Sequence, residues 1–385
     1  MQSPIIIRSK LPNTGISIFA RMTALANQHG AINLAQGFPD FPPPKRLVSL
    51  VADAMRKGHN QYAPMPGVPD LREAIADKTK DTYKCKVDAE KEVTVTAGAT
   101  YGLFAAFQAL LHEGDEVLVF EPAYDSYVPG IQLAGAEPVF VELHAPDYSI
   151  DWEGVKKKIN ARTRAILINT PHNPSGTCWT KNDLLQLEKI VVGTDIIVIS
   201  DEVYEHITFD DGRHESVLRY PKLAQQSIVI SSFGKTYHNT GWKMGYVIAN
   251  ESITKEFRAV HQFLVFSVNT PMQYAVAQFI REAPEHFQDL PQFYQRKRDF
   301  FLEAVKDSRF SFTPASGTYF QLLDYSAISD EQDTVFAERI TAEFGVAAIP
   351  LSPFYRGPVG DRVLRFCFAK SEKTLEKAAA ILCRI

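Results

Sequence analysis

Short apolar runs rich in β-branched residues alternate with helical patterns along the first two thirds of the chain, and this alternation constrains the fold most. The runs lie at residues 93–96, 116–120, 138–141, 165–168, 195–200 and 227–230, with helical patterns at 101–111, 127–133 and 181–191 among them. Runs that are apolar throughout are typical of strands buried on both faces. The order of elements therefore predicts a mostly parallel α/β sheet covered by helices.

The pattern changes after Pro271. A helical pattern over 272–305 is interrupted near Pro284 and Pro291, and short strands are expected at 310–314, 318–323 and 363–368. This predicts a smaller α+β domain at 276–385, after a large domain at 45–275. We expect residues 1–44 to pack with the small domain. Because no repeat or long linker separates these parts, we expect tightly docked domains.

Charge and metal-ligand patterns narrow the possible functions. The 41 Lys and Arg residues against 45 Asp and Glu give a net charge of −4, and no basic cluster is interleaved with aromatics. We expect no nucleic-acid partner. The ten histidines lack metal-binding spacing, so we expect no metal site.

Cysteine usage and hydropathy bear on location. The four cysteines are scattered, which is typical of reduced thiols in a cytosolic protein. Residues 5–7 are apolar, but Arg8 and Lys10 follow at once and leave no room for a signal peptide. The uncharged stretches 93–111 and 262–280 contain polar residues or proline, which favours buried segments over membrane spans. We expect a cytoplasmic protein without a membrane partner.

Two residues at strand ends suggest a cofactor, because ligands of open α/β sheets bind beyond the carboxyl ends of strands. Lys235 follows the run at 227–230, and Val229 stands where a phosphate-binding P-loop would need glycine. Lys235 is either an ordinary surface lysine or a desolvated amine that forms a Schiff base with a carbonyl cofactor. Asp201 directly follows an apolar run, where a carboxylate needs a cationic partner. A pyridinium nitrogen facing Asp, together with a Lys Schiff base, indicates pyridoxal phosphate. The alternative is that Asp201 caps a helix and Tyr204 lies in the core.

The turn at 96–102 joins a strand to a helix and contains Gly98 and Gly102. Such a turn offers free backbone N–H groups and the positive end of a helix dipole to a phosphate. It is not a dinucleotide fingerprint, which would require glycine in place of Thr100. Ser232 and Lys243 add a hydroxyl and a cation on either side of Lys235.

Several motifs in a fixed order resemble class I pyridoxal-phosphate aminotransferases of fold type I. They are residues 173–176 (NPSG), 201–204 (DEVY), 232–235 (SFGK), 241–245 (GWKMG) and 364–366 (LRF). Residues 36–41, 60–62 and 121–125 are similar to the branch of kynurenine aminotransferases and glutamine transaminase K, and within it to bacterial methionine aminotransferases. The resemblance spans residues 33–365.

The resemblance implies a role for each motif residue toward pyridoxal 5′-phosphate. Lys235 would form the Schiff base and shuttle the proton, Asp201 would keep the pyridine nitrogen protonated, and Tyr204 would bond the phenolic oxygen. The other implied cofactor contacts are Asn173, Tyr124, Ala99, Thr100, Ser232 and Lys243, with Tyr62 reaching the phosphate from the second subunit of a homodimer.

Substrate binding follows from the same resemblance. Arg365 would hold the α-carboxylate, assisted by Asn173 and the Gly37 backbone. The expected side-chain pocket is aromatic and contains Phe19, Tyr62, Tyr101 and Tyr124. At Thr100, Ser267 and Phe19 the residue type differs from that expected in relatives. No arginine is placed to bind a second carboxylate of a substrate.

We therefore expect an aminotransferase for uncharged amino acids, such as methionine, phenylalanine, tyrosine, histidine or glutamine. Two alternatives stay open at this point. The first is a carbon–sulfur β-lyase that has the same fold and cofactor. The second is a non-catalytic relative that binds ligand.

Overall fold

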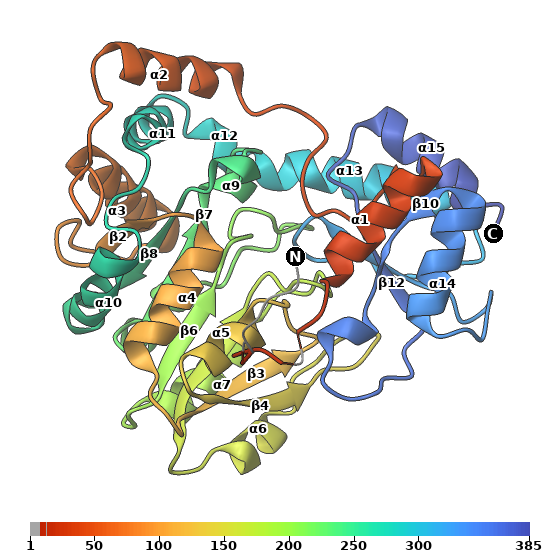
Figure 1. The fold of residues 1–385 in the computed structure, drawn as a ribbon, viewed down its shortest axis with the longest axis horizontal. Coiled ribbons are helices and arrows are strands. Elements are labelled where there is room, and N and C mark those ends of the chain that lie inside the picture. The colour runs from red at the N-terminus through yellow and green to blue at the C-terminus, as the bar shows by residue number, and fades with distance from the viewer. Residues whose placement is uncertain (1–7, 13) are drawn as a thin grey trace.

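A seven-stranded sheet forms the centre of the computed structural model, which describes residues 8–12 and 14–385 (Figure 1). The order across the sheet is β2 (Val93–Thr96), β8 (Gly245–Ala249), β7 (Ser227–Ser232), β6 (Ile197–Asp201), β5 (Thr163–Asn169), β3 (Glu116–Glu121) and β4 (Glu137–Glu142). Only β8 runs antiparallel to its neighbours β2 and β7. The predicted mostly parallel sheet is confirmed.

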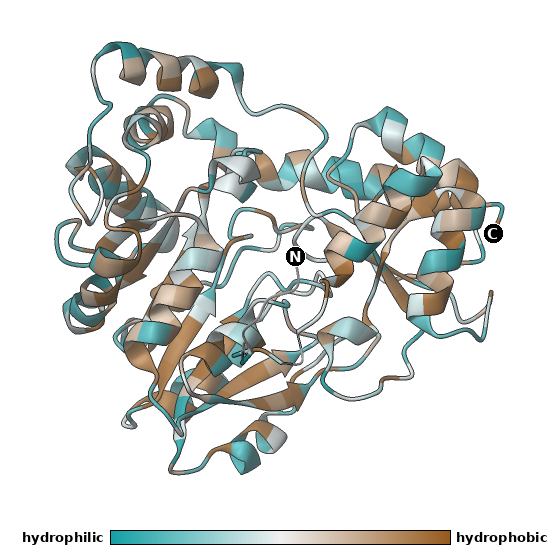
Figure 2. Cartoon of the chain, viewed as in Figure 1, coloured by the Kyte–Doolittle hydropathy of each residue, from teal (hydrophilic) through white to brown (hydrophobic). Residues whose placement is uncertain are grey.

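Each central strand buries side chains on both faces of the sheet. In β5, Ala165 and Leu167 join one apolar cluster, whereas Ile166 and Ile168 join the cluster on the opposite face. This follows from the alternation of side chains along a strand. In Figure 2 the strands of the large sheet are mostly brown (hydrophobic), whereas the helices carry both brown and teal (hydrophilic) segments. The uninterrupted apolar runs in the sequence therefore reflect burial from both sides.

Helices cover both faces of this sheet. They are α2 (Lys45–Arg56), α3 (Pro69–Tyr83), α4 (Ala99–Leu110), α5 (Tyr127–Leu133), α6 (Trp152–Lys158), α7 (Lys181–Val191), α8 (Pro221–Ala224), α9 (Phe233–Thr236), α10 (Glu251–Leu264) and α11 (Thr270–Glu282). The start of α7 is a complete capping box in which Thr180 and Asp183 bond each other's backbone N–H groups, as its sequence indicates. Among the described residues no helix combines the length and the apolar character needed to cross a bilayer.

A second apolar core lies beside the large sheet, on the right in Figure 1. Its helices are α1 (Ile18–His29), α13 (Leu290–Val305), α14 (Asp333–Arg339) and α15 (Glu372–Leu382), whereas the short α12 (Glu285–Gln288) buries Phe287 in the core of the large sheet. Its strands are β1 (Ile32–Asn33) paired with β10 (Val346–Ala347), and β11 (Ile349–Pro350), β12 (Val363–Cys367) and β9 (Phe320–Asp324) in one sheet. Met22 and Ala26 of α1 are buried in this core with residues 290–382. The domain limits at residues 44/45 and 275/276 remain predictions.

One predicted strand was wrong, and one strand of the sheet was missed. The segment 310–314 forms no strand beyond one bridge from Ser311 to Asp324, because the side chain of Gln321 bonds the chain there: Gln321 Nε2 donates to the Thr313 carbonyl at 2.8 Å, and Gln321 Oε1 accepts from the Ala315 N–H at 3.0 Å. Strand β8 was not predicted, although it fills the position between β2 and β7. Its antiparallel direction breaks the strand–helix–strand alternation on which the prediction depended.

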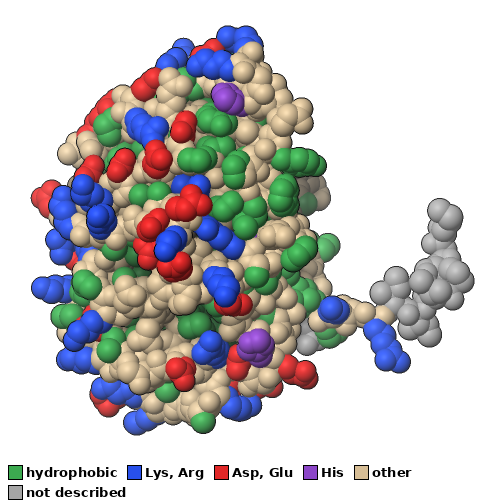
Figure 3. Space-filling model, turned by 90° about the vertical axis from the view of Figure 1, so that its left-hand side faces the viewer, with side chains coloured by type: hydrophobic (Ala, Val, Ile, Leu, Met, Phe, Trp, Pro, Cys, Tyr) green, Lys and Arg blue, Asp and Glu red, His purple; other side chains and the backbone are tan. Residues whose placement is uncertain are grey.

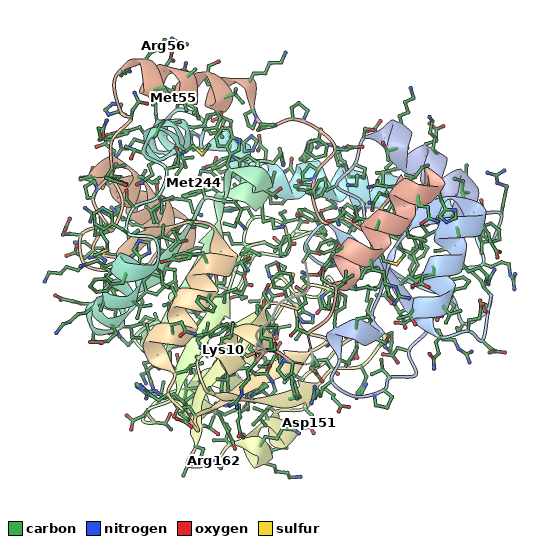
Figure 4. All side chains as sticks on the ribbon, viewed as in Figure 1. Lys10, Met55, Arg56, Asp151, Arg162 and Met244 are labelled. Carbon is green, nitrogen blue, oxygen red and sulfur yellow. The ribbon has the colours of Figure 1, made fainter. Side chains whose placement is uncertain are left out.

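The carboxyl ends of the parallel strands meet at one edge of the sheet. In Figure 4, Met244, which directly precedes β8, lies at the upper end of the sheet, whereas Arg162, which directly precedes β5, lies at the lower end. Since β8 is antiparallel, its beginning lies at the carboxyl end of β7. The candidate site lies at this upper edge.

Candidate active site

A cavity at the carboxyl ends of β5, β6 and β7 brings together every predicted cofactor contact except Tyr62. Its lining includes the predicted residues Ala99, Thr100, Tyr124, Asn173, Asp201, Tyr204, Ser232, Lys235 and Lys243. It also includes Tyr127, Asn169, Val203, Thr240 and Met244, which were not predicted. Residues between 98 and 244 thus share one cavity because parallel strands end side by side.

Lys235 lies in the single turn of α9, directly after β7. The Ser232 hydroxyl accepts a hydrogen bond from the Gly234 N–H at 3.2 Å and fixes the start of this turn. The Lys235 amine donates to the Tyr319 hydroxyl at 2.9 Å and to the Gly37 carbonyl at 3.4 Å. Burial lowers the pKa of Lys235 to about 8. About a tenth of this amine is therefore neutral and nucleophilic at pH 7, far more than for a lysine of ordinary pKa.

Asp201 is the last residue of β6 and is 3% exposed. One carboxylate oxygen accepts from the Tyr127 hydroxyl at 2.7 Å and the other from the Val203 N–H at 3.2 Å. Burial raises the pKa of Asp201 to about 6. In the part of the chain that the structure describes, no cationic side chain donates a hydrogen bond to this carboxylate. A protonated pyridine nitrogen supplies the kind of partner that such a group lacks.

The start of α4 faces the same cavity and suits a phosphate. Gly98 precedes the helix with a φ of +83°, a conformation that favours glycine, and the N–H groups of the first turn have no partners inside the helix. An added Cβ at Gly98 would lie 3.5 Å from Cε of Lys243, so this side chain packs closely against the turn. Twelve residues of α4 direct the positive end of their dipole at the cavity.

Arg365 of β12 is next to the cavity and 1% exposed. Its guanidinium donates to Asn173 Oδ1 at 2.6 Å and to the Ala35 carbonyl at 3.1 Å, and lies 3.8 Å from the ring centre of Phe320. Its Nε has no hydrogen-bond partner among the described residues. Burial lowers the pKa of Arg365. A buried cation with an unused N–H favours binding of a carboxylate.

The other predicted substrate contacts separate into two groups. Phe19 lies near Arg365, with the guanidinium 5.2 Å from its ring centre, and Gly37 presents its carbonyl to Lys235. Tyr62, in contrast, is 84% exposed and contacts Phe266 on the surface, with 5.7 Å between their ring centres. Within one chain, therefore, Tyr62 does not line the cavity.

Tyr101 does not line this cavity either, and its place in the substrate pocket remains a prediction. Its hydroxyl lies 2.6 Å from His261 Nδ1 of α10. Successive residues of an α-helix point about 100° apart, so when Thr100 faces the cavity Tyr101 is directed elsewhere. Of the four predicted aromatic residues, Tyr124 lines the cavity and Phe19 lies beside Arg365, whereas Tyr62 and Tyr101 lie outside the cavity in one chain.

The sequence analysis missed two residues that hold the central groups. Tyr127 bonds Asp201, and it lies near Tyr124 because the Tyr127 N–H donates to the Tyr124 carbonyl at 3.1 Å in a turn that brings both residues to the cavity. Tyr319 bonds Lys235 from the second apolar core, and no local signal connects it with the motifs. No cluster of three or more metal-binding side chains occurs within residues 8–12 and 14–385.

The residues present fit pyridoxal phosphate in each of its parts: an amine for the aldehyde, a buried carboxylate for the ring nitrogen, and a helix start with a lysine for the phosphate. When bound, this cofactor withdraws electrons from the Cα of an attached amino acid. Asp201 and Tyr127 hold the ring end, and Lys235 lies within reach of the carbonyl end. Tyr204, buried beside Lys235, adds a hydroxyl and an aromatic face.

Comparisons with known proteins agree with this arrangement. A family model described as aminotransferase class I and II matches residues 29–382. Methionine aminotransferase of Escherichia coli strain K12 is 51% identical over 377 residues and 98% of each chain. Human kynurenine–oxoglutarate transaminase 1 is 34% identical over 91% of this chain and 92% of its own.

A crystal structure from E. coli, described as identifying a methionine aminotransferase function, aligns with a TM-score of 0.98. It is 50% identical and covers 99% of this chain and 100% of its own. These matches confirm the predicted class and branch and do not favour the carbon–sulfur lyase. The chain therefore belongs to the class I and II aminotransferases and is a pyridoxal-phosphate-dependent enzyme of fold type I.

Proposed function

We propose that the enzyme moves the amino group of an uncharged amino acid, methionine foremost, to a 2-oxo acid. The observation that carries this proposal is the buried pair of Arg365 and Asn173, which adjoins a cavity containing Lys235 and Asp201. The unused Nε of Arg365 binds the α-carboxylate, so the substrate Cα comes to lie near Lys235. The similarity to E. coli methionine aminotransferase supports methionine as a donor.

The surroundings of Arg365 favour uncharged side chains. Phe19, Phe320 and Phe354 place their ring centres 3.8–5.9 Å from its guanidinium carbon. The negative charge of Asp125 acts on the same guanidinium. A second carboxylate on the substrate would meet apolar rings and the charge of Asp125, so dicarboxylic amino acids are disfavoured.

In this proposal the protein residues perform distinct tasks. Lys235 Nζ removes the proton from the substrate Cα and then donates it to the cofactor carbon that receives the amino group. Asp201 keeps the ring nitrogen protonated, with Tyr127 holding its carboxylate in place. Tyr204 and Asn173 would hold the phenolic oxygen, Tyr124 would hold the ring, and the start of α4, Ser232 and Lys243 would hold the phosphate.

The substrate proposal is tested by comparing kcat/KM for methionine, phenylalanine and aspartate with a common 2-oxo acid acceptor. We expect methionine and phenylalanine to exceed aspartate by at least about tenfold, since one buried charge mismatch costs more than about 1.4 kcal/mol. A preference for aspartate would contradict the proposal. A control reaction with cystathionine and no acceptor should release no ammonia.

We also propose a homodimer in which Tyr62 reaches the phosphate of the partner's site. Tyr62 is 84% exposed, and Phe263, Leu264 and Phe266 beside the end of α10 are 83%, 45% and 43% exposed. Thr270 and Ser267 bond the backbone of Gln61 and Ala63, which holds these two segments together. Figure 3 shows hydrophobic side chains along one margin of the face that carries mixed charges elsewhere. An exposed apolar patch of this kind marks an interface.

Phe263→Glu should convert the dimer to monomers in sedimentation velocity and weaken cofactor binding. The matched control is Val335→Glu on α14, which is also an exposed apolar position, at 50%, but lies outside the patch. Unchanged dimers in Phe263→Glu would contradict this interface. The four free cysteines support a cytoplasmic location, which cell fractionation would test.

A further inference from the structure

We propose that Tyr319 is a positioning residue that holds the Lys235 amine in its reactive orientation; this inference rests on the proposed role of Lys235. Tyr319 is completely buried and directly precedes β9. Its hydroxyl oxygen lies 2.9 Å from Lys235 Nζ and 2.5 Å from the Gly37 carbonyl oxygen. One phenol thus connects the second apolar core to the amine at the end of β7.

The hydrogen bonds fix the direction in which each group donates. A phenol has one proton, and a carbonyl oxygen can only accept, so the Tyr319 proton is directed to Gly37. Toward Lys235 the Tyr319 oxygen therefore accepts. Lys235 donates a second N–H to the Gly37 carbonyl at 3.4 Å.

These two acceptors match a neutral amine, which has two N–H bonds and one lone pair. Both N–H bonds are directed to Tyr319 and Gly37, which leaves the lone pair for the cavity. A cationic ammonium group would carry a third N–H, for which the described residues provide no further hydrogen bond. The arrangement thus presents the lone pair that attacks the cofactor carbonyl or accepts the Cα proton.

Packing prevents the Tyr319 ring from turning away. Its ring meets Tyr204 edge to face at 5.1 Å and Phe320 at 4.9 Å, and Tyr294 lies 5.7 Å away. Gly37 is equally constrained, because an added Cβ would come within 2.8 Å of Phe320 Cζ. The acceptor pair therefore has a fixed position relative to the cavity.

Removing only the Tyr319 hydroxyl should slow the reactions of the Lys235 amine. In Tyr319→Phe the amine retains only the long bond to Gly37 and samples other rotamers. We expect the rate constant of attack to fall about two- to tenfold, the range that one hydrogen bond produces. Phosphate anchoring, which involves other residues, should be unaffected.

Stopped-flow mixing of the cofactor-free protein with pyridoxal phosphate separates the rate constant of attack by Lys235 from the affinity that phosphate anchoring provides. The visible absorbance of the loaded enzyme should appear with a limiting rate constant two- to tenfold lower in Tyr319→Phe, at an unchanged half-saturating concentration. Tyr294→Phe is the matched control, since it removes another buried hydroxyl from the same aromatic cluster without touching Lys235. It should load like the wild type.

A second readout uses methionine deuterated at Cα. The isotope effect on kcat should increase in Tyr319→Phe and not in Tyr294→Phe, because only the first change slows proton transfer. Unchanged loading and isotope effect in Tyr319→Phe, or equal losses in both variants, would overturn the inference. Lys235→Ala distinguishes the underlying assignment: if it still gives the same visible absorbance, Lys235 itself has been misassigned.

Discussion

Replacing Asp201 by Asn should change stability and cofactor affinity in opposite directions. In the protein without cofactor, the Asp201 carboxylate is buried, and among the described residues its hydrogen bonds come from the neutral donors of Tyr127 and Val203. Its ionised form is therefore destabilising there. With cofactor, the same charge faces a protonated pyridine nitrogen and becomes favourable.

The magnitude follows from the pKa of Asp201. Burial raises this pKa from 3.8 to about 6, which corresponds to about 3 kcal/mol at about 1.4 kcal/mol for each pKa unit. Because the pKa is higher in the folded state, ionisation of Asp201 destabilises the fold. This loss of stability is absent well below pH 3.8, develops as the pH rises from 3.8 to about 6, and is complete above that value. An Asn amide has one acceptor oxygen, so it accepts less well from one of the two donors, Tyr127 or Val203. This poorer bonding lowers the stability of the variant by about 1 kcal/mol.

Cofactor-free Asp201→Asn should therefore be about 2 kcal/mol more stable than the wild type at pH 8. Near pH 3 the wild-type carboxyl is mostly protonated in both states, so the ionisation penalty is absent and the poorer bonding of Asn should leave the variant about 1 kcal/mol less stable. Urea denaturation at both values measures this. Affinity for pyridoxal phosphate should fall about tenfold or more, from the loss of a charge-assisted bond of about 1.5–3 kcal/mol. A variant that is less stable at pH 8, or that binds the cofactor normally, would refute the reasoning.

Two other substitutions test groups at known contacts. Arg365→Lys should reduce kcat/KM for methionine about 30-fold or more, because a point charge cannot replace the planar guanidinium that bonds Asn173 and stacks on Phe320; equal steady-state constants would remove Arg365 from the site. Lys78→Met should lower the free energy of unfolding by about 3–5 kcal/mol, because Glu205 would remain as a buried charge without its 2.8 Å partner. The double variant Lys78→Met, Glu205→Gln should recover part of that loss in the same denaturation assay.

Much of the site could be predicted because its chemistry lies next to strand ends. Asp201 and Lys235 directly follow apolar runs, and parallel strands bring such positions to one edge. The pairing of Asn169 with Asp201 in adjacent strands shows this register. Local sequence is sufficient where the contact depends on strand direction alone.

The remaining features depend on contacts between distant segments. Tyr319 reaches Lys235 across 84 residues, and the sequence gives no register between β9 and β7. Strand β8 was missed because its antiparallel direction departs from the strand–helix–strand alternation on which the prediction depended. The resemblance alone placed Tyr101 in the pocket, whereas the phase of helix α4 decides where its ring points, which is toward His261.

The absorption spectrum of the purified protein, recorded through both halves of a reaction cycle, tests the central claim most directly. After loading with pyridoxal phosphate, methionine should bleach the visible absorbance, and a 2-oxo acid should restore it. Lys235→Ala should show no such cycle. A loaded enzyme whose spectrum stays unchanged with methionine would contradict the proposed substrate, and a protein that gains no visible absorbance from pyridoxal phosphate would contradict the site itself.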